Sequence, residues 1–302
     1  MVGGRPGELV ANTFFFQIFL LVSTLLLLWG VVGSSQAVHQ VRYIPPTTPS
    51  DCGLPWESLE LTTTDQVQIS GWLIRHPKPK GVLILLHGFG TCKADLLDIA
   101  QAFYTHGSYH LLLIDFRGHG VSGGRFISFG RWEILDIESV LAFISSDPVL
   151  KGFPVGCYGV SMGGSIGILA TARFTQIRAV VSDCAYSDLE KAIARAIWMS
   201  YHIPQIPLGQ VVIWAIEVRL RCWVRHLSPL QHIGRIAPRG VMIIHGMQDK
   251  SVPPESAQAL FKAAREPKRL WLIPEAEHVA SFYRDPEEYL RQVLGFLDHA
   301  LL

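Results

Sequence analysis

A serine stands between two glycines, each two positions away, at the end of an apolar run. Val155–Val160 is that run, and residues 159–163 read Gly-Val-Ser-Met-Gly with Ser161 at the centre. This G-x-S-x-G pattern is typical of a tight strand-to-helix turn, in which the serine is strained and the neighbouring positions need almost no side chain. Ser161 would then stand at the end of a strand, where its hydroxyl can attack a carbonyl carbon once a base takes its proton.

A carboxylate and a histidine follow two later apolar runs. Asp249 comes after the run at 241–245, and His278 comes after the run at 270–273. A histidine can accept a serine proton near neutral pH, and a carboxylate can orient its second ring nitrogen. We therefore predict that Ser161 is the nucleophile, His278 the general base and Asp249 the acid of a catalytic triad. Asp183, at the end of the preceding predicted strand, is the alternative acid.

The oxyanion that forms during such an attack needs N–H donors. The backbone N–H of Met162, at the start of the helix after Ser161, is the first expected donor. The second is the N–H of Phe89, in the sequence His-Gly-Phe-Gly that follows the apolar run at 81–86. His87, His119 and His245 also end strands or follow them, and we interpret them as structural or pocket residues. This chemistry requires no metal and no organic cofactor.

Apolar runs of strand length alternate with segments of helical periodicity through most of the chain. The pattern predicts a mostly parallel sheet with helices on both faces, preceded by an antiparallel hairpin at 57–75. Strands are expected at 82–86, 110–115, 155–160, 179–183, 241–245 and 270–273, and helices at 94–106, 129–144, 161–174, 255–264 and 285–301.

One long segment, at 186–230, interrupts this alternation and is unusually aromatic. Apolar residues recur there every three or four positions, which predicts a cap of two helices. The apolar stripes either pack on the domain, or they carry side chains that line an acyl-binding pocket or touch a bilayer. The side chains concerned in the second interpretation are Trp198, Met199, Trp214 and Trp223.

The N-terminal stretch Phe14–Val32 contains no charged residue. As a helix it would be roughly 28 Å long, about the thickness of the hydrocarbon core of a bilayer. We predict a single-pass membrane anchor or signal segment at 1–33, a linker at 34–55 and a catalytic domain at 56–302. An uncleaved anchor is favoured; the alternative is cleavage after Ser35-Gln36-Ala37, which would release a secreted enzyme beginning at Val38.

The composition excludes some partners. The 302 residues carry a formal net charge of +1 with scattered basic residues, which offers no surface for nucleic acid. The five cysteines lack the spacing of a metal site and are expected to be free thiols.

Together these motifs resemble the α/β-hydrolase-fold serine hydrolases, in the neighbourhood of serine aminopeptidase-like, BEM46-like and monoacylglycerol-lipase-like members. The resemblance covers about residues 54–302; besides the motifs above it rests on Asp115–Gly120 and on Gly246–Asp249. It implies the α/β-hydrolase fold and hydrolysis through an acyl-enzyme. We expect a small-molecule or lipid ester as substrate. Acyl thioester or peptide hydrolysis, or a non-catalytic binding protein on the same fold, are the alternatives.

Overall fold

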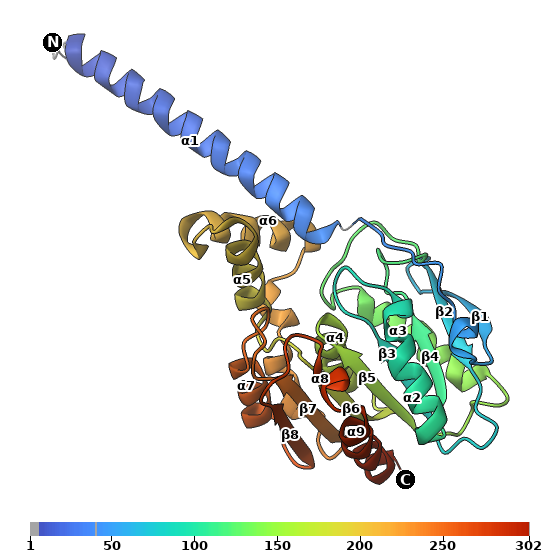
Figure 1. Ribbon diagram of the computed structural model, residues 1–302. Helices are drawn as coiled ribbons and strands as arrows, with labels where there is room; N and C mark the ends of the chain where they lie inside the picture. Colours follow the sequence, from blue (N-terminus) through green and yellow to red (C-terminus); the bar gives the residue numbers. More distant parts are fainter. Residues whose placement is uncertain (1–5, 40, 302) are drawn as a thin grey trace.

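A computed structural model describes the backbone of residues 6–39 and 41–301 and the side chains from residue 14 onward within those ranges. Figure 1 shows a long N-terminal helix, α1 (Pro6–Val38), that projects away from an α/β body. The chain enters the body after α1, and its C-terminal helix packs at the opposite end from α1.

The body is built on one eight-stranded sheet in the order β1-β2-β4-β3-β5-β6-β7-β8. Strands β1 and β2 form the predicted antiparallel hairpin, β2 pairs antiparallel with β4, and all other pairs are parallel. The central strands are nearly continuous apolar runs because both of their faces are covered. Their bounds are β1 (Glu57–Thr62), β2 (Gln68–Ile74), β3 (Val82–Leu86), β4 (His110–Ile114), β5 (Val155–Val160), β6 (Ile177–Asp183), β7 (Gly240–Gly246) and β8 (Lys268–Ile273).

Helices cover both faces of the sheet, because successive strand residues point to opposite sides. Leu83 and Leu85 of β3 share one core with α2 (Leu97–Gly107) and α9 (Pro286–Leu301). Ile84 and Leu86 of the same strand belong to a second core with α3 (Glu133–Ser146), α4 (Met162–Arg173) and α7 (Glu255–Ala263). A short helix, α8 (Ser281–Arg284), precedes α9. The predicted fold class, a mostly parallel sheet with helices on both faces, is confirmed.

The insertion between β6 and β7 forms two main helices, α5 (Leu189–Tyr201) and α6 (Gln210–Leu220). A short π-helical segment, Gln205–Gly209, joins them, and three short 3-10 turns lead back to β7. Helix α5 begins at Asp188, whose carboxylate accepts a hydrogen bond from the backbone N–H of Lys191. Both helices lie between the body and α1 (Figure 1), so the insertion at 186–230 caps the carboxyl ends of the strands.

Helix α1 is both longer and more closely attached than the sequence predicts. It continues to Val38, so the first five residues of the expected linker at 34–55 are helical. Val38 is fully buried, and its carbonyl accepts a hydrogen bond of 2.9 Å from the N–H of Ile127. Within the described residues, Phe14–Val38 is long and apolar enough to cross a membrane.

The junction between the sheet and α4 allows a prediction about stability. A Cβ atom at Gly163 would lie 2.2 Å from the carbonyl oxygen of Leu86, whereas one at Gly167, a turn later, would meet the Cys157 sulfur at 3.1 Å. We expect Gly163→Ala to lower the free energy of unfolding by at least about 3 kcal/mol, because a backbone contact cannot yield. Gly167→Ala should stay within about 1 kcal/mol of the wild type, since the helix-propensity gain offsets mild crowding. Denaturant unfolding of both variants checks the difference, and similar losses would contradict it.

Candidate active site

Ser161 lies in the turn between β5 and α4, in a conformation that few non-glycine residues adopt. Its φ is 51° and its ψ is −117°. The strand and the helix meet so closely that a Cβ atom at Gly159 would lie 2.4 Å from the carbonyl oxygen of Gly163. Two side-chain-free positions therefore force the turn, and the strain at Ser161 directs its hydroxyl away from the backbone and into a cavity.

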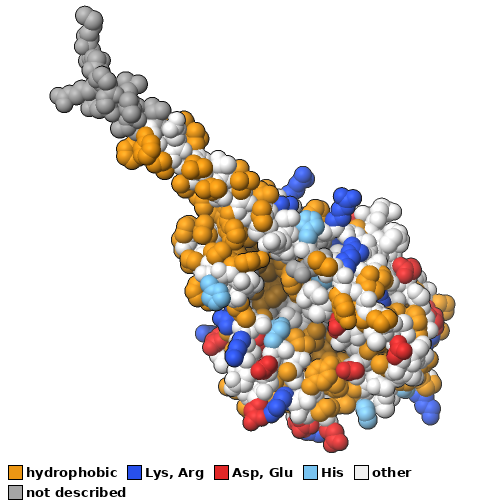
Figure 2. Space-filling view, turned by 45° about the horizontal axis from the view of Figure 1, so that its top comes forward, with side chains coloured by type: hydrophobic (Ala, Val, Ile, Leu, Met, Phe, Trp, Pro, Cys, Tyr) orange, Lys and Arg blue, Asp and Glu red, His pale blue; other side chains and the backbone are white. Residues whose placement is uncertain are grey.

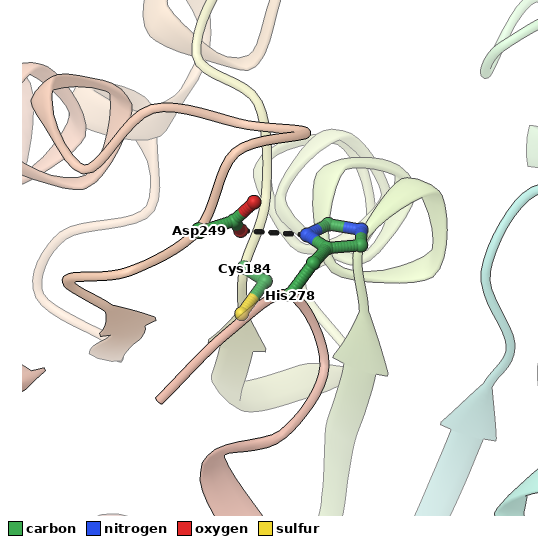
Figure 3. A group of neighbouring side chains, drawn as sticks. All are labelled: Cys184, Asp249 and His278. Atoms are coloured by element: carbon green, nitrogen blue, oxygen red, sulfur yellow. Dashed lines mark hydrogen bonds and ion pairs between the residues drawn. The ribbon is translucent and has the colours of Figure 1, made fainter. Parts of the chain in front are cut away.

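His278 connects Ser161 with Asp249. Its Nε2 lies 3.0 Å from Oγ of Ser161, and its Nδ1 lies 2.6 Å from Oδ2 of Asp249. Figure 3 shows the second of these contacts, with the imidazole and the carboxylate reaching each other from two loops. The three residues follow the ends of β5, β7 and β8. The order Ser161, Asp249, His278 along the polypeptide, as expected from the sequence, therefore brings the three side chains together in one continuous series of hydrogen bonds.

The carboxylate of Asp249 is completely buried yet well supplied with donors. Its Oδ1 accepts the N–H groups of Ser251 and Val252, each at 2.8 Å, and its Oδ2 lies 3.3 Å from Nε2 of His245. Burial alone would raise the pKa of Asp249, but the hydrogen bonds from His245 and His278 outweigh it and hold the pKa below its usual range. Asp249 thus remains an anion that can stabilise a protonated imidazole.

Asp183, the alternative acid, occupies a separate network. Its Oδ1 accepts from the Cys184 thiol at 3.0 Å and from Ser281 Oγ at 2.9 Å, and its Oδ2 accepts from Tyr289 at 2.9 Å. Burial raises the pKa of Asp183. The imidazole of His278 bonds to Asp249 instead, so the geometry favours Asp249 as the triad acid.

Cys184 supports the loop that carries His278, a role that no sequence spacing indicated. Its Sγ accepts the N–H of Val279 at 3.4 Å and lies close to the imidazole (Figure 3). Burial raises the pKa of this thiol well above its usual value, so it stays protonated. Nδ1 of His278 and Oδ2 of Asp249 already bond to each other. The cluster of Cys184, Asp249 and His278 is therefore explained as a hydrogen-bonded support of the histidine.

The two expected oxyanion donors lie beside Ser161. Phe89 and Met162 both line the cavity that contains the serine hydroxyl. Met162 is the first residue of α4, and the N–H groups in the first turn of a helix have no acceptor within that helix. The positive end of the α4 dipole also points towards Ser161, which favours negative charge there.

Two buried histidines hold the loop that carries Phe89. Nδ1 of His87 donates to the carbonyl of Gly88 at 2.7 Å, and its Nε2 accepts the N–H of Phe116 at 3.0 Å. Nε2 of His119 accepts the N–H of Gly90 at 3.3 Å. Burial lowers the pKa of both rings, that of His87 to about 3, so both stay neutral and able to accept. The interpretation of these histidines as structural agrees with their contacts.

A cavity of about 400 Å³ opens over Ser161 and His278. Its lining is largely apolar and comes mainly from the body, from α5 and from α1; among the lining residues are Ile193, Ile197, Tyr201, Trp29 and Ala37. Figure 2 shows hydrophobic side chains that continue from α1 onto the adjoining surface, beside a hollow. The size suits one elongated small molecule.

The four side chains proposed from the sequence to line a pocket do not line this one. Trp198, Met199, Trp214 and Trp223 are each about half exposed, and none of them is among the residues that line the cavity. Helix α5 instead presents Ile193 and Ile197, from its buried stripe, to the cavity. The four exposed side chains remain available for contact with a bilayer.

The fold, the strained serine turn and the order of the three residues define an α/β hydrolase. The chain has the fold of the α/β-hydrolase superfamily, and the profile of the family described as serine aminopeptidase, S33, matches residues 77–214. It is 27% identical over 233 residues to Uncharacterized protein YqkD of Bacillus subtilis, with 76% of this chain and 75% of that protein covered. It is 24% identical over 218 residues to Protein bem46 of Schizosaccharomyces pombe, covering 71% and 67% of the two chains.

Among solved structures, the Pyrococcus furiosus esterase Pf2001 is similar to this chain with a TM-score of 0.74 and 26% sequence identity. The similarity covers 87% of this chain and all of the esterase. These comparisons support hydrolase activity on a small-molecule substrate.

The neutral state of His87 leads to a prediction about pH. An unfolded histidine has a pKa of about 6.5, so between about pH 6.5 and 3 the unfolded chain binds a proton that folded His87 does not. The free energy of unfolding must then fall as the pH falls through this range. The pKa of His119 is also lowered by burial, so His119 likewise makes the free energy of unfolding fall as the pH falls. The pKa of His245 is raised by its contact with Asp249 despite burial, so His245 has the opposite effect.

We expect His87→Gln to flatten the dependence of thermal stability on pH between about pH 6.5 and 4.5. The glutamine amide can still donate and accept, so a folded variant is expected. Melting curves of the two proteins in the same detergent check this, and parallel pH dependences would show that His87 is protonated in the folded state as well.

Proposed function

We propose that this protein is a serine hydrolase that cleaves carboxylic esters through an acyl-enzyme. The observation that carries the proposal is the chain of hydrogen bonds from Ser161 through His278 to Asp249 at the floor of an apolar cavity. The structural neighbour from Pyrococcus furiosus is an esterase, which supports the same reaction class.

The proposed reaction begins when Nε2 of His278 accepts the hydroxyl proton of Ser161. Oγ then attacks the carbonyl carbon, and the carbonyl oxygen becomes an oxyanion next to the N–H groups of Phe89 and Met162. His278 next gives its proton to the leaving alcohol oxygen, the ester bond breaks, and an acyl-enzyme remains. The same imidazole then accepts a proton from a water molecule, whose oxygen attacks the acyl carbon. The imidazolium returns this proton to Oγ of Ser161 as the acyl–oxygen bond breaks, which releases the acid and restores the free serine. Asp249 remains ionised throughout.

The lining of the cavity supports an acyl chain as the part of the substrate that is bound. The described lining residues include no Asp or Glu that could hold the amino group of a peptide. We therefore place lipid-like esters ahead of peptides. Acyl thioesters share the acyl part with esters and differ only in the leaving group.

We also propose that α1 is an uncleaved single-pass anchor and that residues 56–302 form the hydrolase domain with its cap at 186–230. The length and composition of Phe14–Val38 support this. The packing of Gly33 against Val212 and the hydrogen bond from Trp29 to Leu208 support retention of the helix, since cleavage before Val38 would remove both contacts.

The proposed triad is tested with a fluorophosphonate probe and an ester assay. We expect the probe to label the wild-type protein covalently and Ser161→Ala to lose labelling, because only an activated serine beside an oxyanion site reacts. Asp249→Asn should lower kcat for p-nitrophenyl butyrate on the order of 10³-fold or more, since the imidazole loses its orienting anion.

Asp183→Asn is the matched control, because it makes the same change in a neighbouring buried carboxylate that does not contact His278. Its kcat should fall less than about tenfold. A folded wild-type protein that the probe does not label would instead support a non-catalytic binding protein. Faster cleavage of aminoacyl anilides or of acyl thioesters than of esters would move the assignment to a peptidase or a thioesterase.

The proposed anchor is tested by alkaline carbonate extraction. The wild-type protein should stay with the membrane, because each apolar side chain of the span favours insertion by a few tenths of a kcal/mol. Leu21→Arg places a charge near the middle of the span at a cost of about 2.5–3.5 kcal/mol and should weaken retention, whereas Leu21→Ile should not. A mature protein whose N-terminal sequence begins at Val38 would contradict the anchor and indicate secretion.

A further inference from the structure

The last turns of α1 form a wall of the cavity that contains Ser161. Four of the lining residues belong to this helix: Trp29, Gly33, Gln36 and Ala37. Their spacing of four, three and one positions puts them on one face of the helix, over roughly 12 Å of its length. The hollow over the serine is thus closed on one side by the same helix that is apolar enough to cross a membrane.

Close packing fixes this wall against the cap. A Cβ atom at Gly33 would lie 2.7 Å from Cγ2 of Val212, and one at Gly30 would lie 2.9 Å from Cγ1 of Val211. These distances are shorter than side-chain contacts allow, so only glycine lets α1 approach α6 this closely. The face that carries Gly33 therefore cannot rotate away from the cavity without losing its fit to α6.

Polar contacts from the cap fix the same wall. Nε1 of Trp29 donates to the carbonyl of Leu208 at 3.0 Å, and the hydroxyl of Tyr201 donates to Oε1 of Gln36 at 2.9 Å. Nε of Arg219 donates to the hydroxyl of Ser34 at 2.8 Å. The tryptophan and tyrosine rings also meet edge to face, with centroids 6.3 Å apart. Both cap helices and the segment between them hold α1, so the helix is a docked structural element of the site.

Apolar surface on α1 and on the cap leads to this wall and indicates the direction from which a substrate enters the cavity. All four wall residues belong to the apolar part of α1, Phe14–Val38, so one helix connects the stretch that is apolar enough to cross a membrane with the cavity that contains Ser161. The cap also exposes apolar side chains on α5 and α6, among them Trp198 and Trp214. A chain in the bilayer could follow α1 into the cavity without crossing water.

We propose that the cavity takes the acyl chain of an ester that enters directly from the bilayer along α1, and that Trp29 determines how long a chain fits. This inference rests on the proposed esterase function. Moving an acyl chain from lipid into an apolar cavity gains little by transfer alone, because both surroundings are apolar. Selectivity must then come from the shape of the wall, and Trp29 is the largest side chain that α1 contributes to it.

The first test measures chain-length preference in the full-length protein in nanodiscs. The readout is the ratio of kcat/KM for p-nitrophenyl dodecanoate to kcat/KM for p-nitrophenyl butyrate. We expect Trp29→Ala to raise this ratio about tenfold, because removing the indole lengthens the part of the cavity that only the longer chain reaches. The matched control is Leu28→Ala, a neighbouring residue that is 56% exposed and lies outside the cavity lining; its ratio should equal that of the wild type.

If Trp29→Ala does not fold, Trp29→Phe replaces it, since it retains an apolar ring and loses the indole bond to Leu208. A ratio equal to that of Leu28→Ala, or equal losses on both esters, would overturn the role of Trp29. A different result would contradict the proposed esterase function itself: the wild-type protein would hydrolyse neither ester and would not be labelled by the fluorophosphonate.

The second test concerns the route of entry. The wild-type protein is reconstituted in phosphatidylcholine vesicles that contain a fluorogenic long-chain monoacylglycerol analogue. In a parallel sample, the analogue is present only in separate vesicles. Hydrolysis should be at least tenfold faster when enzyme and ester share a membrane. Equal rates, under conditions in which the analogue does not exchange between vesicles, would overturn entry from the bilayer.

Discussion

The structure of the site depends on one close approach, that between the first turn of α4 and the end of β3. The position of Gly163 leaves no room for a Cβ atom beside the carbonyl of Leu86, and this contact fixes the distance between helix and sheet. Ser161, in the connecting turn, is held at a φ of 51°, a conformation that costs on the order of 1–3 kcal/mol and persists only because the surroundings impose it. All other groups of the proposed triad must meet the hydroxyl at the point that this turn determines.

Two buried groups around that point differ in charge state, His87 being neutral and Asp249 ionised. At His87 burial dominates, the pKa falls to about 3, and the neutral ring can both donate to Gly88 and accept from Phe116. At Asp249 burial is outweighed by donors from two histidines, so the carboxylate stays charged. The loop that carries Phe89 therefore needs a neutral histidine, and the imidazole of His278 needs an anion. The same low-dielectric interior can hold both a neutral His87 and an ionised Asp249, because Asp249 receives hydrogen bonds from several donors and those bonds stabilise its charge.

The sequence predicted the sheet, the turn at Ser161 and the grouping of Ser161, Asp249 and His278, because each of these follows from local patterns at strand ends and from chain order. Their catalytic roles remain predictions. The sequence left two interpretations open for Trp198, Met199, Trp214 and Trp223, because both faces of the cap helices carry large apolar residues and periodicity does not tell which face is covered. None of the four is among the residues that line the cavity over Ser161. Nor could it identify Cys184, whose contact with the loop of His278 joins residues nearly a hundred positions apart.

The composition of helix α1 shows that it is apolar, but only its packing explains which of its faces meets the body. A run without charges inserts into hydrocarbon equally well in any rotation about its own axis, so insertion alone cannot orient the hydrolase. The glycine contacts of Gly30 and Gly33 with α6, and the bond from Arg219 to Ser34, allow only one rotation. This rotation turns Trp29 and Ala37 towards Ser161 and leaves Leu28 exposed. In the proposed anchored protein, the contact between α1 and α6 that would orient the body relative to the membrane is the same one that closes the cavity, and neither can change without the other.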